Sequence, residues 1–445
     1  MFKTTICALA TARMNCAIHL IRMSGPNAYH IINLITDKTI DKKGYKITHA
    51  NIVDNNQVID NVLINCFVAP NSYTGEDIVE INCHGGVLIA DKILSLLIKY
   101  GAQLATKGEF TKRAMMNKKI DLSQTEAINN LIHAQNELAI KGSINALSGK
   151  TSEVLKKIRN ALFNLIGQIE VNIDYPEYDD VEQVTSNYAH EITNKLIKQL
   201  KELLNNSKRF IPLNEGIKIL ILGAPNAGKS TLLNTLTKSD KAIVSHIPGT
   251  TRDIIEASIN IDDITLKLFD TAGIRTTNDE VEQLGINKAK EYLKQVDLVL
   301  LLQPINELDS SWKQQYNDIL QHKHIIVYTK SDLSKSKIDL ASNEVVISAI
   351  NNEIDDLIHK IKKLFEVEDF SNSDMNVLQS QRQINLLEQA IHYLEQSISQ
   401  LNNNVPLDLV IESYNSSLDS LNKVLGLDYE YDFLDELFKN FCLGK

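Results

Sequence analysis

The chain has 445 residues, a formal net charge of −10 at pH 7 and a hydrophobic content of 43%. A chain of this length exceeds one hydrophobic core, so we expect two or three domains. The negative charge argues against binding of RNA or DNA over the whole surface, so any such contact would be a local patch or shared with a partner. The five cysteines form no C-x-x-C pair, and the longest apolar runs are too short for a membrane span. Because no signal sequence opens the chain, we expect a cytoplasmic protein with reduced thiols.

In chain order, the predicted elements change character three times. Short apolar stretches separated by turn residues predict strands over 5–11, 17–23, 62–69 and 78–83 and a helix over 88–100. Apolar residues then recur at helical spacing from 122 to 171 and again over 189–204. Strands and helices alternate to about residue 365, and a bundle-type helical stripe follows over 384–401.

This order predicts a nucleotide domain inserted into a helical domain. We expect an N-terminal α+β domain over residues 1–117 and a P-loop domain of the doubly wound α/β type over 214–370. The helical domain is then formed from two parts, 118–213 and 371–445.

The clearest motif is the octet Gly223-Ala224-Pro225-Asn226-Ala227-Gly228-Lys229-Ser230. It fits G-x-x-x-x-G-K-[ST], the phosphate-binding loop, and it lies between an apolar strand and an amphipathic helix. Its glycines let backbone N–H groups turn toward an anion at the helix N-terminus. Lys229 suits the β- and γ-phosphates, and the Ser230 hydroxyl suits Mg²⁺.

Four further motifs point to guanine nucleotides. Thr329-Lys330-Ser331-Asp332 follows a strand, and Asp332 can accept both N–H donors of guanine, a pair that adenine lacks. Ser348-Ala349 suits the last base-contacting loop, and Asp270-Thr271-Ala272-Gly273 suits a loop that senses the γ-phosphate. Between the phosphate loop and Asp270, residues 248–253 contain threonines that can complete the metal shell. Five motifs in order, each at the carboxyl end of a strand, predict a GTPase.

Two departures from the Ras-like pattern concern catalysis. Ile274 stands where a glutamine would orient water, and the phosphate loop contains no arginine. Asn226 can offer a side-chain carbonyl beside the phosphates, where a monovalent cation would supply the missing positive charge. The alternative is that Asn226 only forms the loop.

The whole chain resembles the bacterial and organellar tRNA modification GTPases called MnmE or TrmE. The resemblance rests on 21–26, on Asn71-Ser72-Tyr73-Thr74-Gly75-Glu76-Asp77, on His84-Gly85-Gly86 and on 108–122. It continues through Gly249-Thr250-Thr251-Arg252-Asp253 and 279–282 to the end, Cys442-Leu443-Gly444-Lys445, which is similar to the family's Cys-Ile-Gly-Lys terminus.

The resemblance implies an enzyme that acts on tRNA. Such proteins form homodimers and a heterotetramer with a flavoprotein, MnmG or GidA, which carries FAD. Together they add a carboxymethylaminomethyl or aminomethyl group to C5 of the wobble uridine, U34. The one-carbon donor is a reduced folate, 5-formyl- or 5,10-methylene-tetrahydrofolate. A rival interpretation is a switch protein that binds RNA or ribosomes without modification chemistry, and another is a folate-binding scaffold with a vestigial GTPase.

The resemblance also assigns site residues. It implies Mg²⁺ at Ser230 and Thr251, and K⁺ at Asn226, Ser245, Ile247 and Thr250. Glu282 would position the attacking water, and Cys442 would act near the one-carbon unit. The implied folate contacts are Arg22, Glu80, Lys119 and Lys445. The motifs and the resemblance together give this GTP-binding set: Asn226, Ala227, Gly228, Lys229, Ser230, Thr231, Ser245, His246, Ile247, Pro248, Gly249, Thr250, Thr251, Asp270, Thr271, Ala272, Gly273, Thr329, Lys330, Asp332, Ser348 and Ala349.

Two positions depart from the family pattern. Thr329 replaces the usual Asn, so a shorter contact between the base site and the phosphate loop and weaker guanine binding are expected. The family's glycine-rich turn is replaced by Ala12-Arg13-Met14-Asn15-Cys16, which would reshape the folate site. The apolar residues Leu434, Leu437, Phe438 and Phe441 are expected to dock the C-terminal tail on the helical domain.

Overall fold

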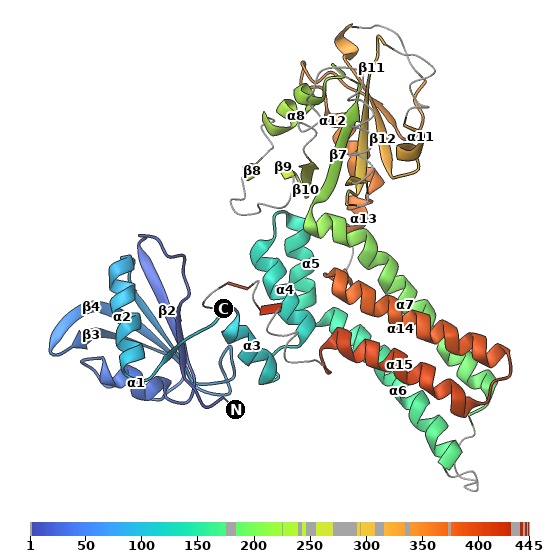
Figure 1. The fold of residues 1–445 in the computed structure, drawn as a ribbon. Coiled ribbons are helices and arrows are strands. Elements are labelled where there is room, and N and C mark those ends of the chain that lie inside the picture. The colour runs from blue at the N-terminus through green and yellow to red at the C-terminus, as the bar shows by residue number, and fades with distance from the viewer. Residues whose placement is uncertain are drawn as a thin grey trace. The chain divides into compact units, whose positions relative to one another are not determined.

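The computed structural model divides the chain into two compact units, Met1–Asn129 with Asn422–Lys445, and Asn130–Leu421. Figure 1 shows the fold with the elements labelled. The structure describes residues 2–174, 184–224, 226–238, 243–245, 255–269, 292–293, 295–307, 316–333, 339–372, 375–428, 437–438, 441–442 and 444. Each unit is described by itself.

The first unit contains a six-stranded sheet with the spatial order β3-β4-β5-β2-β1-β6. Its strands are β1 (Ile6–Leu9), β2 (Ile18–Ser24), β3 (Lys46–Asp54), β4 (Gln57–Phe67), β5 (Ile78–His84) and β6 (Gln103–Leu104). Its helices are α1 (Ala28–Leu34), α2 (Val87–Lys99), α3 (Glu109–Met116) and α4 (Leu122–His133), the last of which crosses the unit boundary. Residues of α1 and α2 pack on one face of the sheet, in a core that includes Ile21, Ile31, Ile64 and Ile93.

The sequence predicts four of these strands, but not β3 or the two-residue strand β6. In β3 the buried positions hold Ala50 and Ile52, whereas the apolar Ile47 is 67% exposed. A strand is recognised by large apolar residues at alternate, buried positions, and this pattern is weak when a small residue such as Ala50 is buried and Ile47 is exposed. Pairing with β4 along the whole of β3 supplies the backbone hydrogen bonds that the local pattern does not predict.

The second unit contains a seven-stranded sheet with the order β13-β12-β11-β7-β10-β9-β8. Its strands are β7 (Ile217–Gly223), β8 (Ile243–Ser245), β9 (Ile255–Ile261), β10 (Ile264–Phe269), β11 (Leu298–Pro304), β12 (His324–Thr329) and β13 (Glu344–Val346). The five strands β13, β12, β11, β7 and β10 run parallel to one another. Strand β9 pairs antiparallel with β10, and β8 pairs antiparallel with β9. Among the described residues, four helices accompany the sheet: α8 (Lys229–Lys238), α11 (Asn317–Leu320), α12 (Asp355–Leu364) and α13 (Val367–Asn372). This confirms the predicted doubly wound G domain.

Long helices precede and follow the G domain in the chain. They are α5 (Glu137–Leu147), α6 (Lys150–Asp174), α7 (Ser186–Glu215), α14 (Gln381–Asn402) and α15 (Leu407–Leu425). Apolar faces bury Leu196 and Leu200 of α7 and Leu387 and Leu394 of α14. Thr193 of α7 is hydrogen-bonded to Tyr414 of α15 at 2.9 Å. The helical domain therefore encloses the G domain in sequence, as predicted.

Helix α7 is longer than the sequence predicts. The expected helix ended at 204, but α7 continues to Glu215 and meets β7 at Ile217. Two apparent helix breakers are accommodated within it. Ser207 donates to the carbonyl oxygen of Leu203 at 2.7 Å, and Pro212 lies between Phe210 and Leu213, both fully buried in the core of the G domain.

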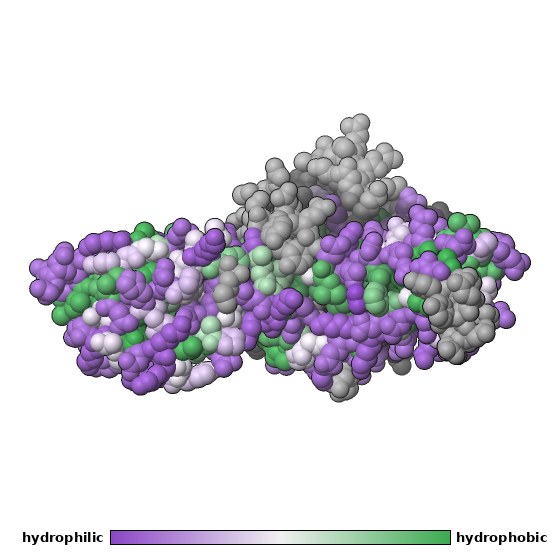
Figure 2. Space-filling view, turned by 90° about the horizontal axis from the view of Figure 1, so that it is seen from below, coloured by the Kyte–Doolittle hydropathy of each residue, from purple (hydrophilic) through white to green (hydrophobic). Residues whose placement is uncertain are grey.

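Polar residues dominate the face of the described residues that is seen from below in Figure 2. Figure 2 shows hydrophilic residues over most of one face, with apolar side chains in small groups. Within the described ranges, no helix is both long enough and apolar enough to span a membrane.

Candidate functional site

The phosphate loop lies at the carboxyl end of β7 and leads directly into α8. Gly223 has a φ of 152°, and a Cβ built there would lie 2.4 Å from the carbonyl oxygen of Leu302. Gly228 has a φ of 92° and Asn226 a φ of 62°, both in the left-handed region. Only glycine fits at Gly223, because a side chain would collide with the backbone of β11. Pro225 lies outside the described residues.

The ammonium group of Lys229 is held by backbone carbonyl groups of the phosphate loop. The Nζ of Lys229 donates to the carbonyl oxygens of Gly223 at 2.5 Å and Ala224 at 2.8 Å. Lys229 is also the first residue of α8, where helix N–H groups lack partners within the helix. An ammonium group and a helix N-terminus at one place favour a bound anion. Ser230 and Thr231, in the first turn of α8, are exposed.

The predicted base loops meet the phosphate loop through side-chain hydrogen bonds. Thr329, at the end of β12, donates from Oγ1 to the carbonyl oxygen of Ala227 at 2.8 Å, and both residues are buried. The Thr329 hydroxyl therefore reaches the phosphate loop, although the shorter side chain, which replaces the family's usual Asn, was expected to reach less far. Lys330 follows with a left-handed φ of 61°.

The carboxylate expected to select guanine is also oriented. Ser348 donates from Oγ to Oδ1 of Asp332 at 2.9 Å, and Asp332 itself is exposed. The next residue, Ala349, accepts a hydrogen bond at its carbonyl from Thr235 of α8 at 2.8 Å. The motifs of the sequence do not include Thr235, because a threonine inside a helix carries no motif signal.

Much of the predicted catalytic set lies outside the described residues. Ser245 ends β8, where its register partner is Ser258. Not described are His246, Ile247, Pro248, Gly249, Thr250, Thr251, Asp270, Thr271, Ala272, Gly273, Glu282 and Lys445.

A second group of predicted residues meets in the first unit. Arg22 and Glu80 are register partners on β2 and β5, and Nε of Arg22 donates to Oε1 of Glu80 at 2.8 Å. The guanidinium carbon lies 5.8 Å from the ring centre of Tyr73 and 5.7 Å from that of Phe110. Burial raises the pKa of the Tyr73 phenol. Charge and aromatic surface thus lie together, and the two rings belong to motifs already noted in the sequence.

Lys119 lies on the segment after α3. Its Nζ donates to the carbonyl oxygen of Pro70 at 3.0 Å. The side chain also passes beside Gly75, where a Cβ would lie 3.3 Å from Cγ of Lys119. The lysine therefore contacts the segment between β4 and β5, which also carries Tyr73.

The C-terminal tail belongs to the same unit. Phe438 and Phe441 pack with Met115 and Leu122, so the tail docks on α3 and the start of α4. The prediction that it docks on the helical domain is thus correct only in part. The carbonyl oxygen of Cys442 accepts from the N–H of Gly108 at 3.2 Å, and Cys442 is exposed.

Gly444 brings the tail to the charged pair. Its carbonyl oxygen accepts a hydrogen bond from NH1 of Arg22 at 3.1 Å. Gly444 has a φ of 88°, and a Cβ there would lie 2.6 Å from Cα of Ala10. A glycine is therefore required at this contact, because the tail backbone lies against β1 and its continuation.

The motif that ends in Glu76 and Asp77 has a structural role. Oε2 of Glu76 lies 2.8 Å from the Ser24 hydroxyl and 3.2 Å from NH1 of Arg113, a side chain with no exposed surface. NH1 of Arg113 also donates to the carbonyl oxygen of Thr4 at 2.8 Å. This buried network joins β2 and α3 to the segment before β1 and to the segment between β4 and β5.

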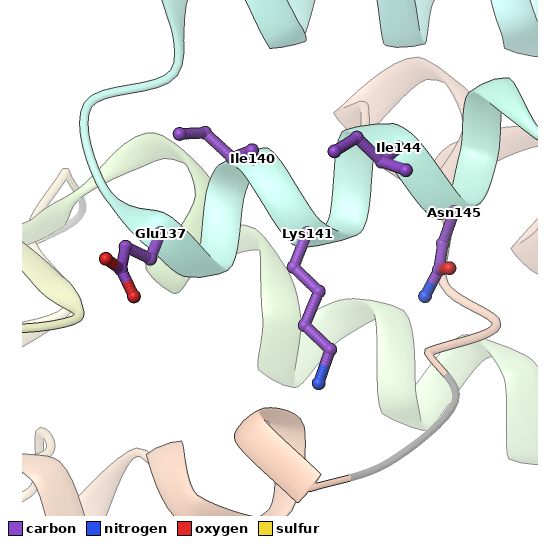
Figure 3. A pocket seen from close by; sticks show the side chains of 5 residues that line it. All are labelled: Glu137, Ile140, Lys141, Ile144 and Asn145. Atoms are coloured by element: carbon purple, nitrogen blue, oxygen red, sulfur yellow. The ribbon is translucent and has the colours of Figure 1, made fainter.

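A pocket on α5 contains none of the predicted site residues. Figure 3 shows the side chains that line it, which are those of Glu137, Ile140, Lys141, Ile144 and Asn145. Lys141 donates to the carbonyl oxygen of Phe370 in α13 at 3.3 Å. The phosphate and base loops lie elsewhere in this unit, so we do not assign the nucleotide to this pocket.

A phosphate loop, a following helix and two base loops at the carboxyl edge of a doubly wound sheet define a P-loop nucleotide-binding protein, and Asp332 makes it a candidate for guanine. Comparison with known proteins agrees. Residues 122–442 match the family model described as the MnmE helical domain, and residues 5–119 match the GTP-binding protein TrmE N-terminus.

Full-length relatives extend this match over the whole chain. A tRNA modification GTPase MnmE of Ureaplasma parvum is 54% identical over 442 residues, covering 99% of this chain and 100% of the relative. Its counterpart in Mycoplasmoides gallisepticum is 46% identical, covering 99% and 98%. That of Bacillus licheniformis is 38% identical, covering 99% and 100%. The chain belongs to the MnmE family of tRNA modification GTPases and is a GTP-hydrolysing enzyme.

Proposed function

We propose that this chain hydrolyses GTP, with Mg²⁺ and K⁺, to drive the modification of the wobble uridine U34 of tRNA. In this proposal it acts as a homodimer in a heterotetramer with the flavoprotein MnmG, which carries FAD. A reduced folate, 5-formyl- or 5,10-methylene-tetrahydrofolate, supplies the carbon added at C5. The observation that carries the proposal is that one chain combines a phosphate loop with a second site, where Arg22, Glu80 and the tail meet.

The phosphate loop fits a nucleotide with its metal ion. Lys229 and the first turn of α8 suit the phosphates, and the exposed hydroxyl of Ser230 suits Mg²⁺, with Thr251 as the second protein ligand. Asn226 is exposed in the loop, so its side-chain carbonyl is available to a cation. We assign K⁺ to Asn226 together with Ser245, Ile247 and Thr250. The ion supplies positive charge to the phosphates in a loop that has no arginine, and Glu282 orients the attacking water.

The second site fits a reduced folate. A guanidinium is suited to the carboxylates of a glutamate tail, and a carboxylate is suited to the donor edge of a pterin. Arg22 and Glu80 provide these groups, and Tyr73 and Phe110 provide aromatic surface beside the guanidinium. Lys119 and Lys445 are assigned as further contacts. Cys442 is exposed at the same tail, so its thiol is accessible to a bound ligand.

The function is tested by nucleoside analysis of tRNA from cells lacking this protein. We expect the C5 group of U34 to disappear and to return with the wild-type gene, but not with Arg22→Ala. Normal U34 in the deletion strain would refute the modification role and leave a switch that binds RNA or ribosomes.

The cation is tested separately by GTP turnover in K⁺ and in Na⁺ at matched ionic strength. Turnover should be higher in K⁺ by powers of ten, because the ion takes the place of an arginine finger, and Asn226→Ala should remove the difference. Equal turnover in the two salts would refute the cation site and would leave the proposed role in tRNA modification unaffected.

A further inference from the structure

A threonine outside the recognised motifs connects the phosphate-binding helix to the base loop. Thr235 lies in the second turn of α8, six residues after Lys229. Its Oγ1 is 2.8 Å from the carbonyl oxygen of Ala349 and 2.9 Å from that of Thr231 in its own helix. A hydroxyl has one hydrogen, so it donates to one of these carbonyls at a time. The carbonyl of Thr231 already has a partner in the helix ladder, whereas that of Ala349 lies in a loop.

The loop that accepts this hydrogen bond, residues 348–353, is closed by backbone hydrogen bonds between its two ends. Ser348 and Glu353 form an isolated bridge, with N–H to carbonyl distances of 2.9 and 3.3 Å. The N–H of Asn352 donates to Ala349 at 3.3 Å, a long hydrogen bond. The contact from Thr235 at 2.8 Å is therefore the shorter of the two on this carbonyl. It ties the closed loop to an element outside it.

The same loop orients the guanine-selecting carboxylate. The Ser348 hydroxyl donates to Asp332 at 2.9 Å, so a displacement of 348–349 is passed on to Asp332. On the other side, Thr329 bonds to Ala227 in the phosphate loop. Two side-chain hydrogen bonds thus connect the phosphate-binding segment to the two base loops, and one of them comes from Thr235.

We propose that Thr235 is a positioning residue for guanine nucleotides. By holding the carbonyl of Ala349 to α8, it fixes the base loop relative to the phosphate loop. The base and the phosphates of the nucleotide are then bound by loops whose relative position is fixed. The bond slows the release of GDP and sharpens the preference for guanine over bases that lack its 2-amino group. The inference requires only that guanine nucleotides bind here, and it is independent of the tRNA, folate and potassium proposals.

The chain provides a matched control on the same helix. Thr237 is also half-buried, and its hydroxyl lies 3.0 Å from the carbonyls of Leu233 and Asn234, both within α8. Thr235→Val and Thr237→Val each replace a hydroxyl by a methyl group of similar size, and both keep a β-branched residue in the helix. They differ in whether that hydroxyl contacts the base loop.

The experiment measures GDP dissociation from the full-length protein with a fluorescent GDP, together with the affinities for GDP and IDP. For Thr235→Val we expect dissociation to be faster by about 2- to 12-fold, the effect of one hydrogen bond, with a smaller ratio between GDP and IDP affinities. Thr235→Ser keeps the donor and should restore both values. Thr237→Val should behave as wild type.

Two outcomes would overturn the proposal. One is wild-type dissociation and base preference in Thr235→Val. The other is an equal change in Thr237→Val, which would indicate a general loosening of α8. Circular dichroism and the melting temperature of each variant show whether it folds, and the ratio of GDP to IDP affinities compares two ligands on one protein, so a partly unfolded fraction does not change it.

Discussion

Replacing Arg113 by methionine tests whether the buried network of Arg113, Glu76 and Ser24 holds the first unit together. The Arg113 side chain is 1% exposed, and its guanidinium pairs with Glu76 at 3.2 Å and with Glu109 at 2.9 Å. It also lies 4.5 Å from the ring centre of Phe2. Methionine retains much of the side-chain volume, so the change mainly removes charge and hydrogen bonds.

The expected effect follows from what remains buried. Without Arg113, the Glu76 carboxylate, only 8% exposed, keeps the Ser24 hydroxyl as a donor but loses its cation. Removing one partner of a buried ion pair destabilises by about 3–5 kcal/mol. In a unit of roughly 150 residues, where about 1 kcal/mol shifts the melting temperature by 2–4 °C, this is about 6–20 °C. Glu76→Gln in the same background should recover part of the loss, because it removes the unpaired charge.

The control is Arg13→Met. Arg13 pairs with Asp91 at 2.8 Å, but its side chain is 67% exposed, so about 0–1 kcal/mol is expected. Hydrogen exchange of the backbone amides of β2 and α3 in the full-length protein reports the opening of this unit separately from the rest. If Arg113→Met increases exchange no more than Arg13→Met does, the network is not what stabilises the unit.

Four further predictions concern the two sites and the contact between the G domain and α5. Thr329→Val should weaken GDP binding about 5- to 100-fold, because the carbonyl of Ala227 loses a buried donor, whereas Thr329→Asn should leave the dissociation constant nearly unchanged. Asp332→Asn should shift preference toward xanthosine nucleotides in a competition assay. Cys442→Ser should keep GTP turnover and lose tRNA modification; full modification would make the thiol a packing residue. Asn136→Ala should destabilise by about 1–3 kcal/mol in urea unfolding, because Asn136 is buried and bonds to Ala139, Leu213 and Thr265.

The G domain could be predicted because its signals are local. An apolar strand, a glycine loop with Lys229 and a helix follow one another within about twenty residues, and the chain order fixes their contacts. Of the later motifs, the two base loops lie where the sequence predicts them, because Thr329-Lys330-Ser331-Asp332 and Ser348-Ala349 follow the parallel strands β12 and β13. Sequence order and spatial order agree closely in such a sheet, so little was left to tertiary contacts.

The rest depends on residues far apart in the chain. Arg22 was expected to meet a ligand, but its bond to the carbonyl of Gly444 joins positions 422 residues apart. Arg113 was part of a quoted motif, yet nothing local shows that it is buried against Glu76 and Thr4. Helix α7 was cut short, because Ser207 and Pro212 are helix breakers unless a core takes up the residues beside them. In each case burial overrides the local preference.

Thr329 shows why the length of a side chain alone does not predict a contact. Thr is shorter than the Asn usual in the family, and a weaker connection to the phosphate loop was expected. The length of a hydrogen bond, however, depends on where the two backbones lie. Here the end of β12 approaches the loop closely, since a Cβ on Gly228 would already be in ordinary contact with Thr329 at 3.7 Å. At that approach a hydroxyl is sufficient to reach Ala227. The glycine of the phosphate loop and the threonine of the base loop therefore have to be considered together, because the left-handed φ of 92° at Gly228, which brings the loop here, is strained for any residue with a side chain.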